Sequence, residues 1–311
     1  MSSTKDASQI NRMPIFIILG LALALVAGVL GGARYVFHQA TQQPVAMPEM
    51  PSPLADSPEC AEFVAGLPQK VLGYSRAEIA APAPAGAAAW QRSSNERVTL
   101  RCGVDMPLQY NVFAQPEIFD GVSWLRVDDA VPESTMATWF TTDRSPAVAV
   151  TADTAQLVGD ASPVAEIDAS NLPQVHIDPA PAPLASLAGG DTSACGALAA
   201  HAPQQIAEGF SLVDVPGVDP NSPTLAWTAP GREPVVLRCG VAPPPAYEAG
   251  VGLVQVNNIA WFEDTEAGIG TASTWYALGR AADIAASVPL TGGNEVMTNL
   301  SNLIDEAVPA R

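Results

Sequence analysis

Residues that commonly perform catalysis are scarce in this chain of 311 residues. It has only three histidines, His38, His176 and His201. The sequence patterns of serine hydrolases, zinc proteases, phosphate-binding loops and dinucleotide-binding folds are absent. We therefore expect no catalytic residue, no metal site and no cofactor.

Basic residues are also few. The chain has 14 lysines and arginines against 32 aspartates and glutamates. All but three of the basic residues and all but one of the acidic ones follow Arg34, so the part of the chain beyond it carries a large negative charge. Such a surface repels nucleic acids and anionic lipid headgroups. We expect no nucleic-acid partner.

Long apolar runs are absent except for one near the N-terminus, PIFIILGLALALVAGVLGGA, which covers residues 14–33 without a charge. As a helix, 20 residues span roughly 30 Å, the thickness of bilayer hydrocarbon. We predict a membrane anchor over residues 14–37, and basic residues before the run favour an inner N-terminal tail, residues 1–13. The alternative is a cleaved signal peptide, whose apolar core is usually shorter.

The same phrase occurs twice in the chain, as VTLRCGV with Arg101 and as VVLRCGV with Arg238. A tryptophan precedes each arginine by 11 residues and another follows it by 23; these are Trp90 and Trp124 in the first copy and Trp227 and Trp261 in the second. A register kept over this distance indicates duplication of a whole domain.

Proline- and alanine-rich stretches mark the borders of the two copies. We predict a spacer at residues 38–57, a first domain at 58–176, a linker at 177–191 and a second domain at 192–311. Proline-rich composition is typical of extended, semi-rigid spacers, so we expect the domains to stand apart from the membrane and from each other.

Within each copy the pattern predicts one opening helix followed by strands. Residues 60–71 have helical spacing, and residues 198–210 repeat it less well, with a break at Pro203. Alternating residues predict strands at the RCG phrase and in further segments, among which we read residues 254–262 as one strand. A second-copy helix is predicted at residues 294–307, and the first copy has lost most of its equivalent. The fold class is therefore α+β: a single transmembrane helix and two homologous disulfide-bonded domains, each an antiparallel sheet with helices on one face.

All four cysteines follow the apolar run, and each copy has one in its opening helix and one in its RCG strand. An even, duplicated set in an exported protein predicts intradomain disulfides, Cys60–Cys102 and Cys195–Cys239. Buried free thiols and a metal site are the alternatives, although the chain has no CxxC pair. The glycine after each RCG cysteine would permit a close backbone approach.

Recurrent arginines are the other candidate site residues. Arg101 and Arg238 alternate with the cysteines and so lie on the opposite sheet face, and Arg144 and Arg280 recur near a later strand. We expect them to satisfy buried carbonyl or carboxylate groups; an anion-binding site is the alternative. The repeated tryptophans are expected to pack in the core.

The apolar span, the opening cysteine, the pattern W-x10-RCGV and the later tryptophan strand together resemble a family of actinobacterial membrane-anchored envelope proteins. The resemblance covers roughly residues 60–150 and 195–307, and the RCGV core is its most specific part. That family has no assigned biochemical function, and its members generally carry one such domain. The resemblance implies a location in the cell envelope and adds no reaction.

These observations predict a non-catalytic, single-pass envelope protein in the cytoplasmic membrane, with most of the chain outside. We expect it to be a scaffold, adaptor or accessory subunit for another envelope or membrane protein. The alternative is a hydrolase or transferase that acts on envelope glycans through two carboxylates about 5–10 Å apart. No acidic pair recurs in both copies, and we interpret the run Glu263, Asp264 and Glu266 as a solvated loop.

Overall fold

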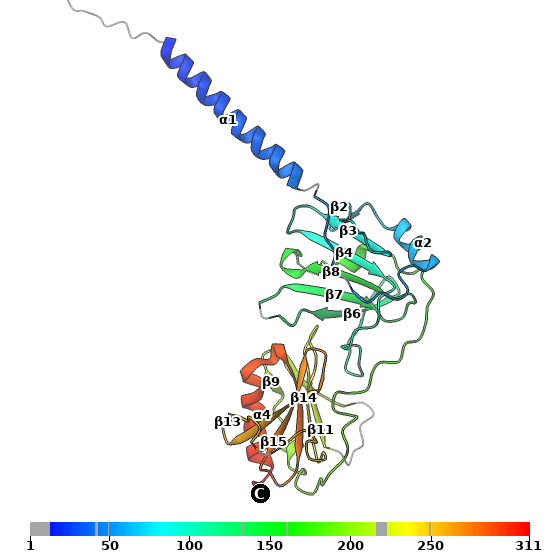
Figure 1. Ribbon diagram of the computed structural model, residues 1–311, viewed down its shortest axis with the longest axis vertical. Helices are drawn as coiled ribbons and strands as arrows, with labels where there is room; N and C mark the ends of the chain where they lie inside the picture. The colour runs from blue at the N-terminus through cyan, green and yellow to red at the C-terminus, as the bar shows by residue number, and fades with distance from the viewer. Residues whose placement is uncertain are drawn as a thin grey trace, which may run out of the picture.

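The computed structural model describes residues 13–40, 43–48, 50–131, 133–159, 161–215, 223–248 and 250–311. Helix α1, Met13–Ala40, projects from one end of the molecule (Figure 1). Its segment Phe16–Val36 is long and apolar enough to cross a membrane, and none of the other described residues covers it. Residues 1–12 of the predicted N-terminal tail lie outside the described residues.

The two copies, here called repeat 1 and repeat 2, have the same sheet topology. Each has an eight-stranded antiparallel sheet, in the order β1-β2-β3-β4-β8-β7-β6-β5 in repeat 1 and β9-β10-β11-β12-β16-β15-β14-β13 in repeat 2. The strands of repeat 1 are β1 Lys70–Val71, β2 Tyr74–Arg76, β3 Ala87–Gln91, β4 Arg97–Cys102, β5 Glu117–Phe119, β6 Val122–Asp128, β7 Met136–Thr141 and β8 Val148–Asp153. Those of repeat 2 are β9 Gln205–Ala207, β10 Phe210–Val213, β11 Thr224–Thr228, β12 Val235–Cys239, β13 Val254–Val256, β14 Ile259–Ile269, β15 Ala272–Leu278 and β16 Ile284–Pro289.

Both RCG phrases form central strands, as predicted. In repeat 1, Leu100 of β4 lies opposite Ala88 of β3 on one side and Val150 of β8 on the other. Strand β12 has the equivalent position between β11 and β16. Because successive side chains alternate, the cysteine points to one face, here called the disulfide face, and the arginine to the other, the arginine face.

Helices cover the disulfide face of each sheet, which confirms the predicted α+β class. They are α2 Pro58–Gly66 in repeat 1 and α3 Leu198–His201 and α4 Gly293–Ala307 in repeat 2, with short 3-10 turns η1 Thr154–Gln156, η2 Pro163–Glu166 and η3 Leu290–Gly292. In repeat 1, η2 stands where repeat 2 has its long terminal helix, as the sequence predicted.

Three predicted boundaries were wrong. Val71 belongs to strand β1 and not to the opening helix, because α2 ends at Gly66 before Leu67 and Pro68. The segment 205–213 forms the hairpin β9–β10 and not a helix. Residues 254–262 are two strands, because the backbone turns at Asn257, whose φ is 50°. A short apolar run is compatible with a helix or a strand, and the strand it pairs with in a hairpin determines which one forms.

Both predicted disulfides are present. Cys60 pairs with Cys102 at a Cα–Cα distance of 5.5 Å, and Cys195 pairs with Cys239 at 5.9 Å. The first ties helix α2 to the central strand β4, within a core that includes Trp90 and Trp124. The second ties the segment before α3 to β12, so the prediction that Cys195 lies in the opening helix was wrong. The four tryptophans are at most 1% exposed.

The segments predicted as free spacers are packed against the sheets. Val45, before repeat 1, is 3% exposed and its backbone pairs with that of Ile79. Leu184, in the linker, is 8% exposed and belongs to a core on the arginine face of repeat 2. The expectation that these segments hold the domains apart was therefore wrong, because their alanine, valine and leucine side chains gain more from burial than from solvation.

Candidate functional site

The RCG phrase holds the segment that precedes each opening cysteine. We call these segments the lead segments; they are residues 44–48 and 50–57 in repeat 1 and 181–194 in repeat 2. Arg101 donates a hydrogen bond from Nη2 to the carbonyl oxygen of Pro48. Arg238 donates from Nη1 to the carbonyl oxygens of Leu184 at 2.7 Å and Leu187 at 2.9 Å. Both arginines thus hold the backbone of a lead segment against the arginine face, and in repeat 2 that backbone forms a turn at residues 183–186.

The glycine of the phrase completes the same contact. Gly103 and Gly240 have φ values of 84° and 72°, which side chains rarely adopt. A Cβ atom on Gly103 would come within 2.3 Å of the Leu54 backbone, and one on Gly240 within 2.4 Å of Thr192. The predicted close backbone approach is confirmed, and its partner is the lead segment.

The second pair of arginines lies in the connections β7–β8 and β15–β16, near the strand ends that also carry the RCG glycines. Arg144 donates from Nη2 to Gly121 O at 2.9 Å, and Arg280 donates to Asn258 O at 3.1 Å. Their backbones pair with the C-terminal part of each repeat. Arg280 also pairs with Asp305 at 2.6 Å. The pKa of Asp305 is lowered by a hydrogen bond from Asn258 and then by Arg280.

All four recurrent arginines therefore bind carbonyl groups of their own chain, which favours the structural interpretation. The histidines do not come together. His176 is exposed beside Asp178, His201 lies near its own helix backbone, and His38 belongs to α1. Among the described residues no group of three or more histidine, cysteine or acidic side chains could hold a metal ion.

A loop of repeat 1 inserts between the lead segment and the sheet of repeat 2. This junction loop, residues 104–116, follows β4 directly. Phe113 is 8% exposed and packs with Ala226, Val236 and Phe262 on the arginine face of repeat 2. The backbone of Val112 donates to Ala180 O at 2.9 Å, and Ala180 N donates back to Tyr110 O at 2.9 Å. The two repeats are thereby joined through an apolar contact and a short backbone ladder.

Polar contacts extend the junction toward the turn between β11 and β12. Asp128 N donates to Gly231 O at 2.7 Å. Glu233 accepts from Gln109 Nε2 at 3.1 Å through one oxygen and from Thr271 Oγ1 at 2.9 Å through the other. Burial raises the pKa of Glu233, and the hydrogen bonds from Thr271 and Gln109 oppose that rise. Glu233 thus links both repeats.

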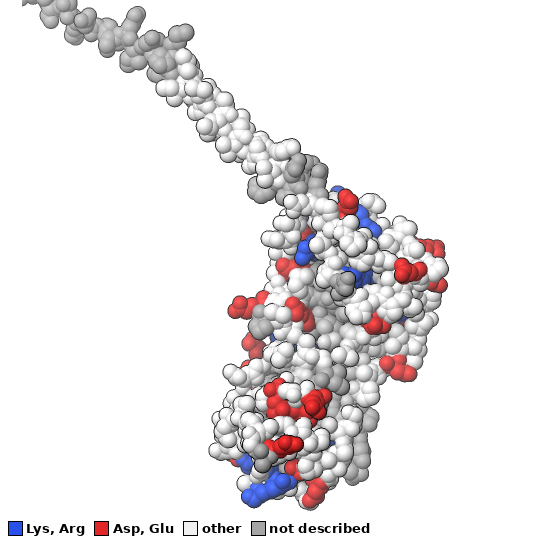
Figure 2. Space-filling view, in the orientation of Figure 1, with Lys and Arg blue, Asp and Glu red and all other residues white. Residues whose placement is uncertain are grey.

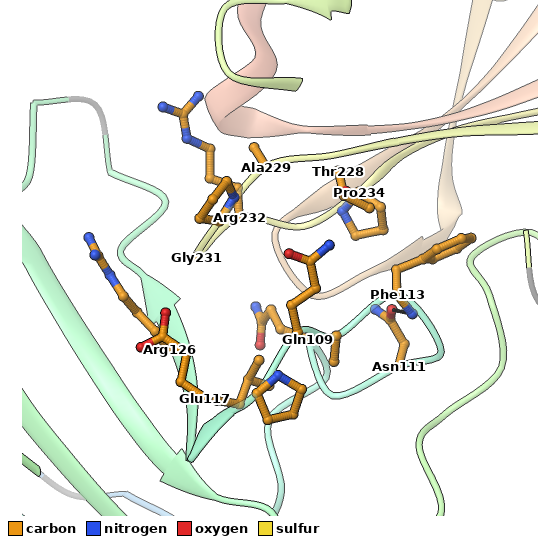
Figure 3. Close-up of a pocket in the computed structure, with 15 residues that line it drawn as sticks. Gln109, Asn111, Phe113, Glu117, Arg126, Thr228, Ala229, Gly231, Arg232 and Pro234 are labelled. Atoms are coloured by element: carbon orange, nitrogen blue, oxygen red, sulfur yellow. Dashed lines mark hydrogen bonds between the residues drawn. The ribbon is translucent and has the colours of Figure 1, made fainter. Parts of the chain in front are cut away.

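A pocket of about 250 Å³ lies at this junction. Figure 3 shows the residues that line it. Gln109, Asn111 and Phe113 of the junction loop line one side of it, and Gly231 and Pro234 of repeat 2 line the other. Two larger hollows lie on the arginine faces. One of about 460 Å³ lies on repeat 1 and one of about 510 Å³ lies on repeat 2 beside the linker. We call the latter the linker cleft.

The two larger hollows occupy equivalent positions. Thr138 and Thr151 line the hollow of repeat 1, and their counterparts Thr274 and Ser287 line the linker cleft. In both, the lead segment forms a wall. A hollow that recurs on the same strands of both repeats is a property of the domain and not of one loop.

Sequence reasoning missed the junction residues. Phe113 aligns with Gly250 and so has no counterpart in repeat 2, which is a signal that it does something specific to repeat 1. Glu233 aligns with Glu96, which forms an ion pair with Arg92 four residues earlier in repeat 1. The interpretation of Glu263, Asp264 and Glu266 as a solvated loop was wrong, because all three belong to strand β14 and Asp264 is 3% exposed. Glu266 lines the linker cleft.

The comparison with protein families gives two matches along the chain. The family described as "Protein of unknown function (DUF3515)" matches residues 19–173 and again residues 164–311. These matches correspond to the two repeats, and the first also includes most of the apolar helix. No curated protein matches the chain.

Proposed function

This chain belongs to the DUF3515 family, a family of unknown function, and we propose that it is a non-catalytic scaffold or adaptor of the cell envelope. In this proposal α1 is retained as a single membrane anchor, with its N-terminus inside and both repeats outside. An apolar helix of sufficient length and two disulfides support that placement, since disulfides persist in oxidising compartments.

The observation that carries the proposal is the junction between the repeats. Phe113 is buried in repeat 2, and the junction loop exchanges backbone hydrogen bonds with residue Ala180 of the linker. Such contacts restrict the motion of one repeat against the other, and on a membrane anchor they would favour one relation between the two arginine faces. A scaffold or adaptor needs this property, whereas a catalyst needs a reactive group.

One observation favours the glycan-acting alternative. Glu233 and Glu266 both line the linker cleft, and the pKa of Glu233 is raised by burial, as expected of a general acid. Against this role, both oxygens of Glu233 accept hydrogen bonds within the junction. Release of labelled sugar from cell-wall material by the purified full chain, lost on Glu266→Gln, would favour the enzyme.

Crosslinking in living cells tests the scaffold. The full chain would carry a photoreactive residue at exposed positions of either arginine face, followed by purification in mild detergent and mass spectrometry. We expect one envelope protein to be crosslinked from both repeats. Phe113→Ala, which loosens the junction, should reduce crosslinking at repeat 2 more than at repeat 1. Crosslinks confined to the lipid, at every position, would contradict the proposal.

A further inference from the structure

The linker cleft has walls from three separate parts of the chain. Leu184 and Leu187 of the lead segment form one side, the junction loop contributes Asn111, and the sheet of repeat 2 forms the floor. The cleft has a volume of about 510 Å³, which is the size of a site for a few residues of an extended peptide. The apolar side chains of the lead segment suit an apolar ligand on that side.

Acidic groups lie at the cleft without basic partners inside it. Glu233 and Glu266 line it, and no lysine or arginine is among the described residues that do. Arg238 lies under the lead segment, where its guanidinium binds carbonyl oxygens. Acidic side chains also gather on the visible face of repeat 2 (Figure 2). The field of the chain, with formal charge −18, attracts cations to this region.

Buried polar groups at the floor and wall lack partners. Ser287 is 5% exposed and points to the arginine face, because its neighbours Ala286 and Val288 pack in the opposite core. Its hydroxyl has no hydrogen bond with any described residue, although it lines the cleft. Asn111, 6% exposed, accepts from Phe113 N through Oδ1, and its Nδ2 has no partner in the described chain. Both groups face the cleft, so a ligand there can replace their hydrogen bonds to solvent with direct ones.

The equivalent hollow in repeat 1 differs in its charge and in the hydrogen bonding of its floor hydroxyls. Arg97 and Arg101 line it together with Asp128 and Asp129, so its charges are balanced. Its two floor hydroxyls, Thr138 and Thr151, bond each other at 2.9 Å. The molecule therefore contains an internal control: the same hollow, of similar volume, without the acidic excess and without the open hydroxyl.

We propose that the linker cleft binds an extended segment of an envelope protein that carries a lysine side chain between apolar residues. The lysine ammonium donates to Glu266 and to the Ser287 hydroxyl, and the amide Nδ2 of Asn111 donates to a carbonyl oxygen of the segment. The flanking apolar side chains pack on Leu184 and Leu187. This inference rests on the proposed function only in naming the partner as an envelope protein.

Binding is measured with the full chain in nanodiscs of zwitterionic lipid, so that the membrane does not attract the peptide. The probe is the acetylated pentapeptide amide Ala-Leu-Lys-Leu-Ala, and its matched control has norleucine in place of lysine. Saturation-transfer NMR with empty nanodiscs as the blank detects affinities in the micromolar to millimolar range. We expect the lysine peptide to bind and the norleucine peptide to bind at least tenfold more weakly, since charge-assisted hydrogen bonds supply the difference.

Variants locate the site. Glu266→Gln combined with Ser287→Ala should weaken the lysine peptide by about tenfold. Glu306→Gln, the same charge change on an exposed position of α4 across the sheet, should leave the affinity unchanged. Asp129→Asn in the hollow of repeat 1 should also have no effect. Circular dichroism and the two disulfides, checked by mass spectrometry, show that each variant is folded.

Several outcomes would overturn the inference. Equal binding of the norleucine and lysine peptides would contradict it. So would the absence of binding by either peptide at about 10 mM, roughly the weakest affinity a functional segment would have. A loss of affinity from Glu306→Gln equal to that from the cleft variant would also contradict it. Cadaverine binding as tightly as the peptide would indicate a site for small amines instead. If the lysine peptide binds but crosslinking in cells finds no envelope protein, the peptide site in the linker cleft is supported and the scaffold function is contradicted.

Discussion

Trp261 donates its indole hydrogen to the hydroxyl of Ser301 in α4, at 2.9 Å. Its counterpart Trp124 is equally buried, yet its Nε1 has no hydrogen-bond partner among the described residues. The difference follows from the terminal helix: repeat 2 has α4, whereas repeat 1 has only the short turn η2 in that place. Without a helix like α4, the described part of repeat 1 offers this buried donor no acceptor, a state that costs about 1–3 kcal/mol.

Changing each tryptophan to phenylalanine should therefore have unequal effects. Trp261→Phe removes a satisfied hydrogen bond and leaves a small cavity, so we expect a loss of about 2 kcal/mol in repeat 2. Trp124→Phe leaves a similar cavity but removes an unsatisfied donor, so repeat 1 should lose about 1 kcal/mol less than that. Hydrogen exchange followed by mass spectrometry reports each repeat separately. Equal losses would show that Trp124 has an acceptor in solution.

Removing the RCG arginines should release the lead segments and leave the sheets folded. Arg238→Ala takes away a donor that holds the carbonyls of Leu184 and Leu187, with an expected cost of about 2 kcal/mol. Limited proteolysis should then cut within residues 181–187 faster than in the wild-type chain. Arg238→Lys keeps the charge but supplies a single ammonium, so it should give intermediate protection. Unchanged cleavage in both variants would contradict this role.

Phe113 should hold the two repeats in their observed relation. Phe113→Ala removes a ring that is buried in the core of repeat 2, at an expected cost of about 3 kcal/mol to the junction. Spin labels on exposed positions of β1 and β13, outside the junction, should show a broader distance distribution between the repeats. Asp105→Ala, at an exposed position of the same loop that lines neither the junction pocket nor the linker cleft, is the matched control and should leave the distribution narrow.

The two disulfides should stabilise different parts of the chain. Breaking Cys195–Cys239 by Cys239→Ser should cost repeat 2 about 4 kcal/mol, the expectation for a loop of 44 residues. Cys102→Ser should cost repeat 1 a similar amount and should also loosen the junction, because Cys102 is followed directly by the loop that carries Phe113. Differential hydrogen exchange at residues 177–187 checks the second effect. A change confined to repeat 1 would mean that the junction loop is anchored by repeat 2 alone.

The junction should respond to pH through Glu233. Its pKa in the folded chain is raised above the ordinary value of 4.5, mainly because burial disfavours the charged form. A raised pKa means that the folded chain binds the proton more tightly than the unfolded chain, so the contribution is complete below pH 4.5 and is lost as the pH rises through the folded pKa. Glu233→Gln should remove this loss. We expect the melting temperature of the variant, minus that of the wild type, to increase with pH from 4 to 7. A constant difference would contradict the raised pKa.

The sequence alone determined the elements that repeat and the pairs that duplication implies. Two tryptophans, two cysteines and an arginine kept in register predicted two similar domains, each with its own disulfide and a central RCG strand, and the structure has them. Strand alternation further predicted that Cys102 and Arg101 point to opposite faces. These features depend on residues near one another in the chain or on comparison of the two copies, and a single sequence contains both.

Only the tertiary structure decided what lies between the copies. Phe113 and Glu233 meet partners more than a hundred positions away, and no periodicity marks them. Proline-rich composition predicted free spacers, but it describes the stiffness of a segment and not whether a sheet face will bury it. The same limit applies to Ser287 and Glu266, which look like ordinary strand residues until the lead segment and the junction loop enclose them in one cleft. Long-range packing decides such sites, because the free energy of burial depends on which surfaces meet and not on the order of residues in the chain.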